Sequence, residues 1–395
     1  MNSGNIPYEA GWHSQLAKEI VKNSRNYDVE CWGIDKNLDN QLQFKEGNIT
    51  YRLFPSTNLR FFGEVSPELI QELYRLAMSE RIIIHIHRVF SYTTYLIPLL
   101  IRTTPIIIQH HGDISCLQGF YEANKIKDKK ALAHLLLYIL RQEWLFERLT
   151  LRRIDRLFVL NDDAMEYFLP MIDNNKIEKL TMGIDFELFT KMDKIAARSL
   201  LGLGKDKKYI LYSGAFVKRK GLEYLLRAMS ILLRDHENYF LILKGDGYYR
   251  DDLESLAREI GIYSNIIFVP WVEKAKLPIY YNAADVCVLP SLDEGLGITA
   301  VEALACETPF IGSDVGGIPD VVRNFGMGVL VKPRDAEAIA EAILTLLGQK
   351  QELRPDRENA RRYYGWEQIA KRNIEIYDEL WATYWENENH NNISN

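Results

Sequence analysis

ADVCVLPSLDEGLGITAVEALACETPFIGSD, residues 284–314, carries the pattern that decides the fold. The stretch begins and ends with short apolar runs, at 284–291 and 308–314. Between them, a glycine-containing turn leads into the alanine-rich segment ITAVEALA. Continuous runs of Val, Ile and Leu are typical of parallel strands that are buried on both faces of a sheet. The stretch therefore predicts a strand, a turn, a helix and another strand, which is the repeating unit of a doubly wound α/β sheet.

The same alternation extends over most of the chain. Other short apolar runs are each followed by a longer segment, and several of these segments have the amphipathic pattern of a helix. This pattern predicts an α/β protein with open, doubly wound parallel sheets. The further strands that we expect are 81–87, 104–112 and 155–162 in the first half of the chain, and 207–216, 239–247 and 265–271 in the second, with helices at 221–235 and 251–261.

The length of 395 residues suits two domains rather than one core. Residues 186–208 contain no strand-like run, so we expect a linker there and a domain boundary near residue 188. The expected domains are 1–188 and 189–364, and segment 365–395, which contains a long helix, is expected to pack back on the first. Residues 9–23 are expected to form the first glycine-bearing turn and helix. The strand before them is very short unless the recorded start omits part of it.

Composition excludes several classes of protein. The formal net charge is −6, so no global field favours nucleic acid. No apolar run reaches the roughly 20 residues that span a bilayer, and the start lacks the pattern of a signal peptide. Four scattered cysteines without metal-ligand or redox spacing indicate a reducing compartment, so we expect a cytoplasmic protein. These cysteines are Cys31, Cys116, Cys287 and Cys306.

Four turns in the second half carry glycine at the point where an expected strand ends. Ligands of parallel sheets bind at this edge, where glycine lets the backbone approach closely and the next helix offers unpaired N–H groups to an anion. One such turn is weak evidence, but four in one domain indicate a phosphorylated ligand. The turns are 213–221, 244–249, 293–299 and 314–320.

Three charged residues stand at or near these turns. Lys220 lies just before a helix, where an ammonium could meet a diphosphate, although a solvated charged loop explains it equally well. Glu294 precedes the expected helix and Glu302 lies inside it among apolar residues. A carboxylate there is costly to bury unless it accepts hydrogen bonds, and sugar hydroxyl groups are suitable donors. The alternative is a helix-start acid favoured by the dipole together with a surface glutamate.

In this context the segment resembles the signature of retaining glycosyltransferases of family 4, which have the GT-B fold. That signature is two glutamates separated by a Gly-x-Gly turn and the start of a helix, here within 294–302, with a Pro-Ser pair upstream and a Gly-Gly turn downstream. SGAFVKRKG at 213–221 is similar to the family's phosphate-binding loop, LKGDGYY at 243–249 to its Gly-Asp-Gly turn, and MGIDFELF at 182–189 to its interdomain segment. The resemblance implies two Rossmann-like doubly wound domains that face a central cleft.

The resemblance also implies roles for individual residues. The first domain would be on the acceptor side and the second would bind the nucleotide sugar. Glu294 and His111 would lie near the transferred sugar, Lys220 would neutralise the diphosphate, and Gly11 would let the first domain close on the donor. The positions implied for donor and nucleotide binding are Gly214, Arg219, Lys220, Gly245, Asp246, Gly295, Leu296, Gly297, Ile298 and Glu302. His85 and His87 are expected to be structural, and His110 to be a weaker choice than His111.

The chemistry implied is transfer of a hexosyl group with retention of configuration and a nucleoside diphosphate as the leaving group. We expect neither a metal nor a cofactor, because Lys220 and the helix N-terminus would meet the developing charge. The chain departs from the family pattern at three positions. Ala215 stands where an arginine normally follows the loop glycine, Met182 replaces the interdomain asparagine, and Trp12 replaces the second N-terminal glycine.

The acceptor stays open among a glycan, a lipid-linked glycan and a small molecule. Segment 124–156 is rich in Lys and Arg among Leu, Trp and Phe. It is expected either to pack on the sheet as an amphipathic helix or to contact an anionic membrane peripherally. Two other kinds of function also fit the pattern, namely a nucleotide-sugar epimerase or sugar phosphorylase of the same fold, and a nucleotide-binding module without catalysis, which Ala215 favours.

Overall fold

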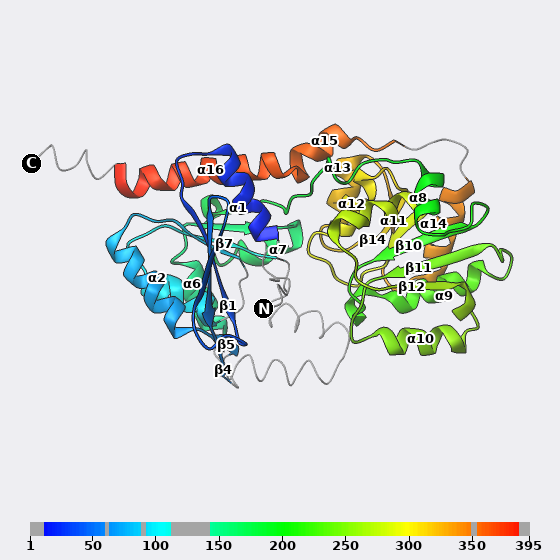
Figure 1. Cartoon of the computed structure of the whole chain (residues 1–395), viewed down its shortest axis with the longest axis horizontal. Coiled ribbons are helices and arrows are strands. Elements are labelled where there is room, and N and C mark those ends of the chain that lie inside the picture. Colours follow the sequence, from blue (N-terminus) through cyan, green and yellow to red (C-terminus); the bar gives the residue numbers. More distant parts are fainter. Residues whose placement is uncertain (1–11, 60–62, 88–91, 112–142, 349–353, 387–395) are drawn as a thin grey trace, which may run out of the picture. The chain divides into compact units, whose positions relative to one another are not determined.

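The computed structural model describes residues 12–59, 63–87, 92–111, 143–348 and 354–386, which form two units (Figure 1). The first unit comprises Met1–Thr181 and Trp366–Asn395, and the second comprises Met182–Gly365. The division thus falls between Thr181 and Met182, whereas the sequence led us to expect it near residue 188. The reason is that the segment after Thr181 bonds to α15 (Arg357–Tyr364), where Arg357 donates to the carbonyl oxygens of Phe186 and Phe189.

The first unit contains a four-stranded parallel sheet in which sequential strands are neighbours. Three of its strands confirm the runs expected from the sequence, with narrower bounds, whereas the three-residue β9 was not expected. Ile106, Ile107 and Ile108 of the second strand are fully buried, as expected for a strand covered on both faces. The strands are β6 (Ile84–His87), β7 (Ile106–Gln109), β8 (Arg156–Val159) and β9 (Ile177–Lys179).

The first unit also contains strands that the sequence reading missed. A three-stranded sheet has the order β1-β3-β2, with β1 parallel and β2 antiparallel to β3, and a two-stranded ribbon joins β4 to β5. We searched for continuous apolar runs, but β1 and β2 carry charged residues and are only half-buried. The strands are β1 (Val29–Asp35), β2 (Leu42–Glu46), β3 (Ile49–Pro55), β4 (Thr57–Leu59) and β5 (Gly63–Val65).

Helices at both ends of the sequence share one core of the first unit. Leu16 and Ile20 of α1 pack with Ile107, Phe158 and apolar residues of α16. Another core lies among α2, α3, α6, α7 and the sheet. The helical elements are α1 (Trp12–Asn23), α2 (Pro67–Ser79), α3 (Tyr92–Leu100), α6 (Glu143–Leu151), α7 (Asp162–Phe168), η1 (Asn174–Lys176), α16 (Trp366–Trp381) and η5 (Ala382–Glu386).

The second unit is built on a six-stranded, fully parallel sheet of order β12-β11-β10-β13-β14-β15. The first five of these strands in sequence were expected, and only the three-residue β15 was missed. The order reverses between β10 and β13, which is the switch point where parallel sheets bind ligands. The strands are β10 (Lys208–Ser213), β11 (Tyr239–Lys244), β12 (Ile266–Val269), β13 (Val286–Leu289), β14 (Phe310–Ser313) and β15 (Val329–Val331).

Helices of the second unit are tied to this sheet by buried polar contacts. Arg198 of α8 donates to Asp285 at 2.6 Å and to the carbonyl oxygen of Ala283, and all three residues are buried. These two hydrogen bonds hold α8, which lies in the segment 186–208 that we expected to be a linker, on the second unit. The helical elements are α8 (Lys194–Leu200), η2 (Lys218–Lys220), α9 (Leu222–Leu232), α10 (Arg250–Glu259), η3 (Tyr263–Asn265), η4 (Lys274–Lys276), α11 (Leu277–Ala283), α12 (Ile298–Ala305), α13 (Ile318–Phe325), α14 (Ala336–Gly348) and α15.

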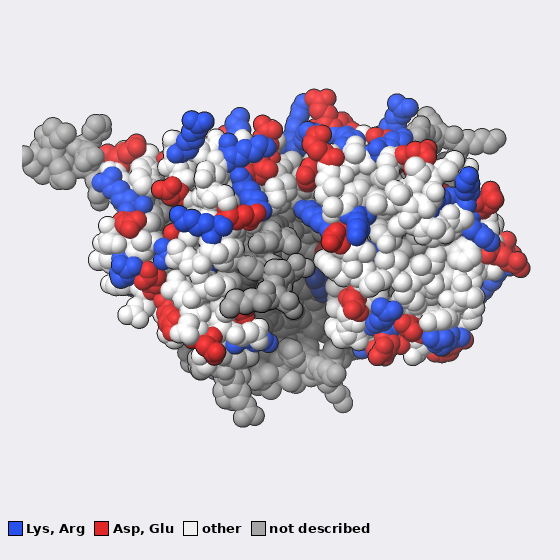
Figure 2. All heavy atoms as spheres, in the orientation of Figure 1, with Lys and Arg blue, Asp and Glu red and all other residues white. Residues whose placement is uncertain are grey.

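The described surface carries charges of both signs. Figure 2 shows Lys and Arg interspersed with Asp and Glu over both units on the face in view, in keeping with the small net charge. Among the described residues, no helix has the length and apolar character needed to cross a membrane. Gly11, Cys116 and most of segment 124–156 lie outside the described residues.

Candidate active site

The four glycine-bearing turns of the second unit meet at the carboxyl edge of its sheet. The amide of Gly214 donates to the carbonyl oxygen of Lys244 at 3.0 Å, which joins the turn after β10 to the end of β11. The amide of Leu292 donates to the carbonyl oxygen of Arg219 at 2.8 Å, and the amide of Gly317 to that of Gly295 at 3.0 Å. Backbone hydrogen bonds thus connect the ends of β10, β11, β13 and β14 into one site frame.

Two glycines are required by this close packing. Gly245 has φ +141°, and a Cβ atom there would lie 1.9 Å from the carbonyl oxygen of Gly214. Gly221 has φ +61°, and its Cβ atom would lie 2.2 Å from the carbonyl oxygen of Pro290. Real atoms cannot approach so closely, so any side chain at these positions would push the turns apart. The glycines therefore set how tightly the site frame closes.

Lys220 and Glu294 form an ion pair at the centre of this frame. Lys220 is the last residue of η2, and Glu294 lies in the turn that follows β13. Their side chains are only 12% and 10% exposed, and the ammonium donates to Oε2 of Glu294. The buried hydroxyl of Ser291 donates to the same oxygen at 3.1 Å. Two residues that are 74 apart in sequence are therefore brought together, and both face each other rather than open solvent.

The N-terminus of α12 lies directly after this pair. Gly297 caps the helix in the left-handed conformation with φ +76°, and Leu296 is buried beside it. Thr299, in the first turn, donates its hydroxyl to the carbonyl oxygen of Ser213 at 2.9 Å, which anchors the helix to the end of β10. The first amides of a helix have no intrahelical partner and carry partial positive charge, so this end can accept an anion.

Glu302 lies inside α12 and is buried, with 8% of its surface exposed. The expectation that such a carboxylate needs hydrogen-bond donors is met within the protein, because the hydroxyl of Tyr281 donates to Oε2 at 2.7 Å. Burial raises the pKa of Glu302, while the Tyr281 hydrogen bond and the charges of Lys274 and Lys244 oppose this rise. Within the described part of the chain this bond engages Oε2 alone, so Oε1 of Glu302 could accept a hydrogen bond from a ligand hydroxyl.

Other expected donor-binding residues lie in the same turns but point differently. Arg219 and Asp246 are exposed. Asp246 accepts a hydrogen bond from the amide of Gly247 at 2.8 Å, which shapes its own turn. Lys218 is also exposed, its ammonium 5.6 Å from the centre of the Tyr249 ring. Neither Lys218 nor Arg219 is therefore buried in the frame as Lys220 is.

The carboxyl edge of the four-stranded sheet in the first unit holds a cluster of imidazoles. His111 follows β7, and its ring centre lies 5.8 Å from that of His87 at the end of β6. The ring centres of His85 and His87 are 4.2 Å apart, and the ring centre of His13 in α1 lies 6.5 Å from that of His87. His85 also bonds through Nδ1 to the hydroxyl of Tyr377 at 2.7 Å. The neighbouring His110 is 2% exposed and packs edge-on against Phe168.

Burial favours the uncharged form of three of these imidazoles, those of His13, His85 and His87. It lowers the pKa of His85 to about 3 and that of His87 well below its ordinary value, and neighbouring histidines lower the latter further. The pKa of His13 is lowered by burial as well. Across the described ranges, no group of three or more His, Cys, Asp or Glu side chains has the arrangement of a metal site.

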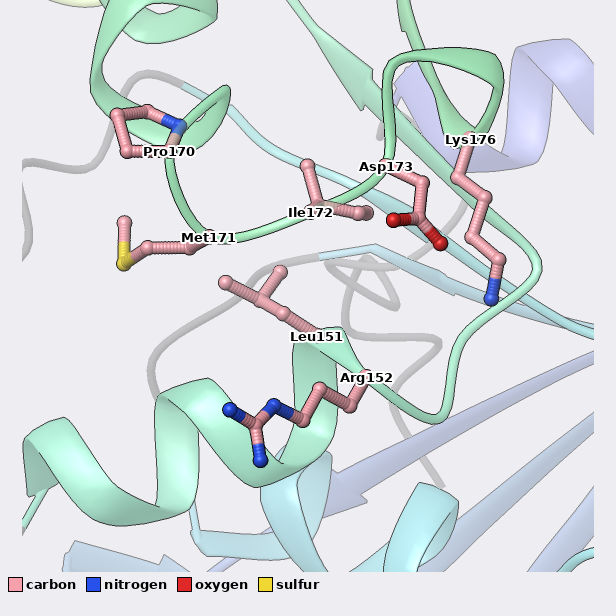
Figure 3. Close-up of a pocket in the computed structure, with 7 residues that line it drawn as sticks. All are labelled: Leu151, Arg152, Pro170, Met171, Ile172, Asp173 and Lys176. Atoms are coloured by element: carbon pink, nitrogen blue, oxygen red, sulfur yellow. The ribbon is translucent and has the colours of Figure 1, made fainter.

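A separate cavity of about 260 Å³ lies in the first unit (Figure 3). The end of α6 with Leu151 and Arg152 faces the loop from Pro170 to Lys176. The ammonium of Lys176 donates to the carbonyl oxygen of Ile154 at 3.0 Å. Because Arg152 precedes β8 and Lys176 precedes β9, this cavity lies at the amino ends of those strands. Parallel sheets bind substrates at the opposite edge, so the cavity is not the candidate active site.

The sequence reading gave no role to three residues of the site. The hydroxyl of Ser291 donates to Glu294 and that of Tyr281 to Glu302. Ser291 is part of the Pro-Ser pair of the family signature, whereas no pattern in the sequence marks Tyr281. Lys244 ends β11 and lies buried in the frame. A signal for Lys244 was present, since it is the one charged residue in the apolar run YFLILK.

Comparison with known proteins gives concordant results. Residues 193–363 match the family described as glycosyl transferases group 1. An uncharacterized glycosyltransferase of Methanocaldococcus jannaschii is 28% identical over 377 residues, which is 92% of each chain. Among solved structures, sucrose-phosphate synthase of Thermosynechococcus elongatus has a TM-score of 0.74 at 23% identity and covers 94% of this chain and 93% of its own. HepE of Anabaena, solved in complex with UDP and glucose, has a TM-score of 0.67 at 17% identity and covers 94% and 96%.

The structural matches confirm the GT-B fold, and the sequence matches confirm the resemblance found in the glutamate signature. Residues 193–363 are similar to the glycosyl transferases group 1 family, and the chain is a glycosyltransferase that takes its sugar from a nucleotide sugar.

Proposed function

We propose that this chain is a retaining hexosyltransferase whose second unit binds the donor through the site frame at the carboxyl edge of its sheet. The observation that carries this proposal is the buried ion pair of Lys220 with Glu294 beside the N-terminus of α12, with Glu302 further along the same helix. The complex of HepE with UDP and glucose favours a UDP-hexose as the donor. The first unit would then hold the acceptor, which is a glycan, a lipid-linked glycan or a small molecule.

In this mechanism, donor binding exchanges the partners of the ion pair. The ammonium of Lys220 moves to the oxygens of the diphosphate, and the carboxylate of Glu294 accepts hydrogen bonds from sugar hydroxyls. The first amides of α12, around Gly297 and Ile298, bind phosphate oxygens, and Glu302 binds the ribose. Because these groups are fixed before reaction, they stabilise the charge that develops on the leaving diphosphate without reorganisation.

Retention follows when the acceptor attacks the face from which the diphosphate departs. The acceptor oxygen forms its bond to the anomeric carbon as the bond from that carbon to the phosphate oxygen breaks. The proton of the acceptor hydroxyl passes to the departing phosphate oxygen. His111 is proposed to hydrogen-bond the transferred sugar, since it follows β7 at the carboxyl edge of its own sheet. Gly11 is proposed to belong to the loop that closes on the donor.

The test is a double-mutant cycle on the ion pair, with nucleotide release from UDP-hexoses and GDP-hexoses as the measurement. Glu294→Gln and Lys220→Met are each expected to lower turnover by about 100-fold or more, as for other preorganised charged groups. The double variant is expected to lose little more, because residues that act as a unit are not additive. Lys276→Met removes an exposed lysine and serves as the control.

The outcome separates the proposal from its rivals. Wild-type turnover in both single variants would remove these residues from the site. Product formation that requires added inorganic phosphate would support a sugar phosphorylase, and epimerised donor would support an epimerase. Nucleotide binding without any turnover would support a binding module.

Peripheral contact with an anionic membrane through 124–156 is part of the proposal. Within the described portion of this segment, Leu145 and Leu149 are each 37% exposed, and Arg148 and Arg152 are exposed beside them. Exposed apolar residues with flanking arginines favour anionic lipid surfaces. We expect the protein to sediment with vesicles of phosphatidylglycerol and phosphatidylcholine, and not with phosphatidylcholine alone. Failure to sediment with either would favour an acceptor that is free in solution.

A further inference from the structure

Lys244 is a buried lysine to which the mechanism above gives no task. It is the last residue of β11 and directly precedes Gly245 of the site frame. Its side chain is 2% exposed, and within the described part of the chain it makes no hydrogen bond or ion pair. Its one ring contact is with Trp271, whose centre lies 4.6 Å from the ammonium.

Such a side chain is costly for the folded protein. An ammonium loses its hydration on burial, and the loss is recovered only through close partners. Burial lowers the pKa of Lys244, and the charge of Glu302 opposes this effect without an ion pair being formed. The ring of Trp271 compensates in part, because cations are attracted to aromatic faces. The hydroxyl of Tyr281 already donates to one oxygen of Glu302, and Lys244 forms no ion pair with this carboxylate among the described residues. The ammonium of Lys244 could therefore pair with a bound anion.

Lys244 lies close in the sheet to Ala215, the position at which the chain departs from the family pattern. In the sheet, Lys244 is paired with Ser213, and its carbonyl oxygen accepts the amide of Gly214. Ala215 is the position where the family pattern places an arginine, and it is exposed here. The positive charge that is absent after β10 is therefore present on the neighbouring strand, in the same site frame.

We propose that Lys244 is a donor-binding residue that contacts the phosphate on the nucleoside side of the diphosphate and replaces the cation absent at Ala215. The assignment to the nucleoside side follows from its neighbours. Lys220 pairs with Glu294, the acid proposed for the sugar, in the turn after β13, whereas Lys244 ends β11, which β10 separates from β13 in the sheet. Trp271, whose ring centre lies 4.6 Å from the ammonium, is 74% exposed. This inference rests on the proposed function, since it assumes that the frame binds a nucleotide.

The test is calorimetric titration of the wild type, Lys244→Met, Lys244→Arg and the exposed-lysine control Lys276→Met. The affinities of UDP, GDP and ADP are first compared on the wild type. The nucleoside diphosphate that binds most tightly is then titrated into each variant, together with the corresponding nucleoside monophosphate and nucleoside. Lys244→Met is expected to weaken the diphosphate and the monophosphate by about 10- to 100-fold, as for loss of one charged hydrogen bond. The nucleoside is expected to bind nearly as before, and Lys244→Arg is expected to recover most of the loss.

A melting experiment separates binding from a structural task. Without ligand, Lys244→Met should raise the Tm by about 1–4 °C, because a buried and incompletely paired charge is removed. A lower Tm together with equal losses for nucleoside and nucleotide would show that Lys244 only supports the fold, and would overturn the inference. If the wild type binds the nucleotides and Lys244→Met binds the monophosphate with unchanged affinity, the inference about Lys244 is overturned while the proposed function stands. A wild type that binds none of the three diphosphates would overturn the proposed function as well.

Discussion

The carboxyl edges of the two main sheets share one topology and differ in chemistry. In the second unit, the edge carries charged groups of both signs, with Lys220 bonded to Glu294 and with Lys244 and Glu302 buried without an ion pair between them. In the first unit, the corresponding edge carries four imidazoles, which are His13, His85, His87 and His111. Both edges are equivalent products of parallel strands that feed helices, so the fold does not decide which ligand each one binds.

The protonation of these groups explains what each edge can recognise. A diphosphate needs cations, and the second unit places ammonium groups where burial makes their charge effective. Burial in the first unit keeps His85 and His87 neutral at physiological pH, with a pKa of about 3 for His85. Neutral imidazoles donate and accept hydrogen bonds without favouring anions, and this suits the hydroxyl groups of sugars. Under the proposed function, the charge of the diphosphate is met in the second unit alone, whereas the imidazoles of the first unit would contact only hydroxyl groups.

The largest effect that would sharpen this comparison concerns His111. His111→Ala is expected to lower kcat by about 10- to 100-fold while the Kd of UDP stays within about twofold, because it would remove the proposed contact to the reacting sugar and leave the phosphate site intact. Steady-state kinetics and nucleotide titration measure the two quantities. His236→Ala, which removes a histidine stacked on Tyr239 in the second unit, is the control. A parallel loss of UDP affinity in His111→Ala would break the division between the two edges.

A smaller effect concerns His85 and acid stability. The folded pKa of about 3 lies below the unfolded value of 6.5, so the unfolded chain binds this proton first. The stabilisation is therefore fully present above pH 6.5 and is lost as the pH falls toward 3, by at most about 1.4 kcal/mol per pH unit. We expect His85→Gln to be less stable than the wild type at pH 7, since the bond to Tyr377 changes, and to lose less stability between pH 6.5 and 4. Urea unfolding at several pH values measures the free energy of unfolding of both proteins. An equal change of this free energy with pH in the wild type and in His85→Gln would contradict the prediction.

Much of the architecture could be predicted because buried parallel strands are recognisable in the sequence as continuous apolar runs. Runs such as 207–216 and 284–291 became β10 and β13, since burial on both faces requires apolar residues throughout. The strands β1 and β2 escaped prediction because a half-buried strand carries polar residues and lacks that signal. The domain boundary was displaced for a different reason, namely that Phe186 and Phe189 bond to a helix more than 160 residues later.

For the site, spacing identified the glycine turns, because strand, turn and helix are local in sequence and a turn without room for Cβ must be glycine. The two glutamates were singled out by their resemblance to the family signature. The tertiary structure alone decided which side chains meet. Lys220 reaches Glu294, Tyr281 reaches Glu302, and Lys244 is buried beside Trp271 through the lateral order of strands that are distant in the chain. Sequence distance carries no information about that order, so the partners of each charge, and hence its protonation and chemistry, appear only once the sheet is assembled.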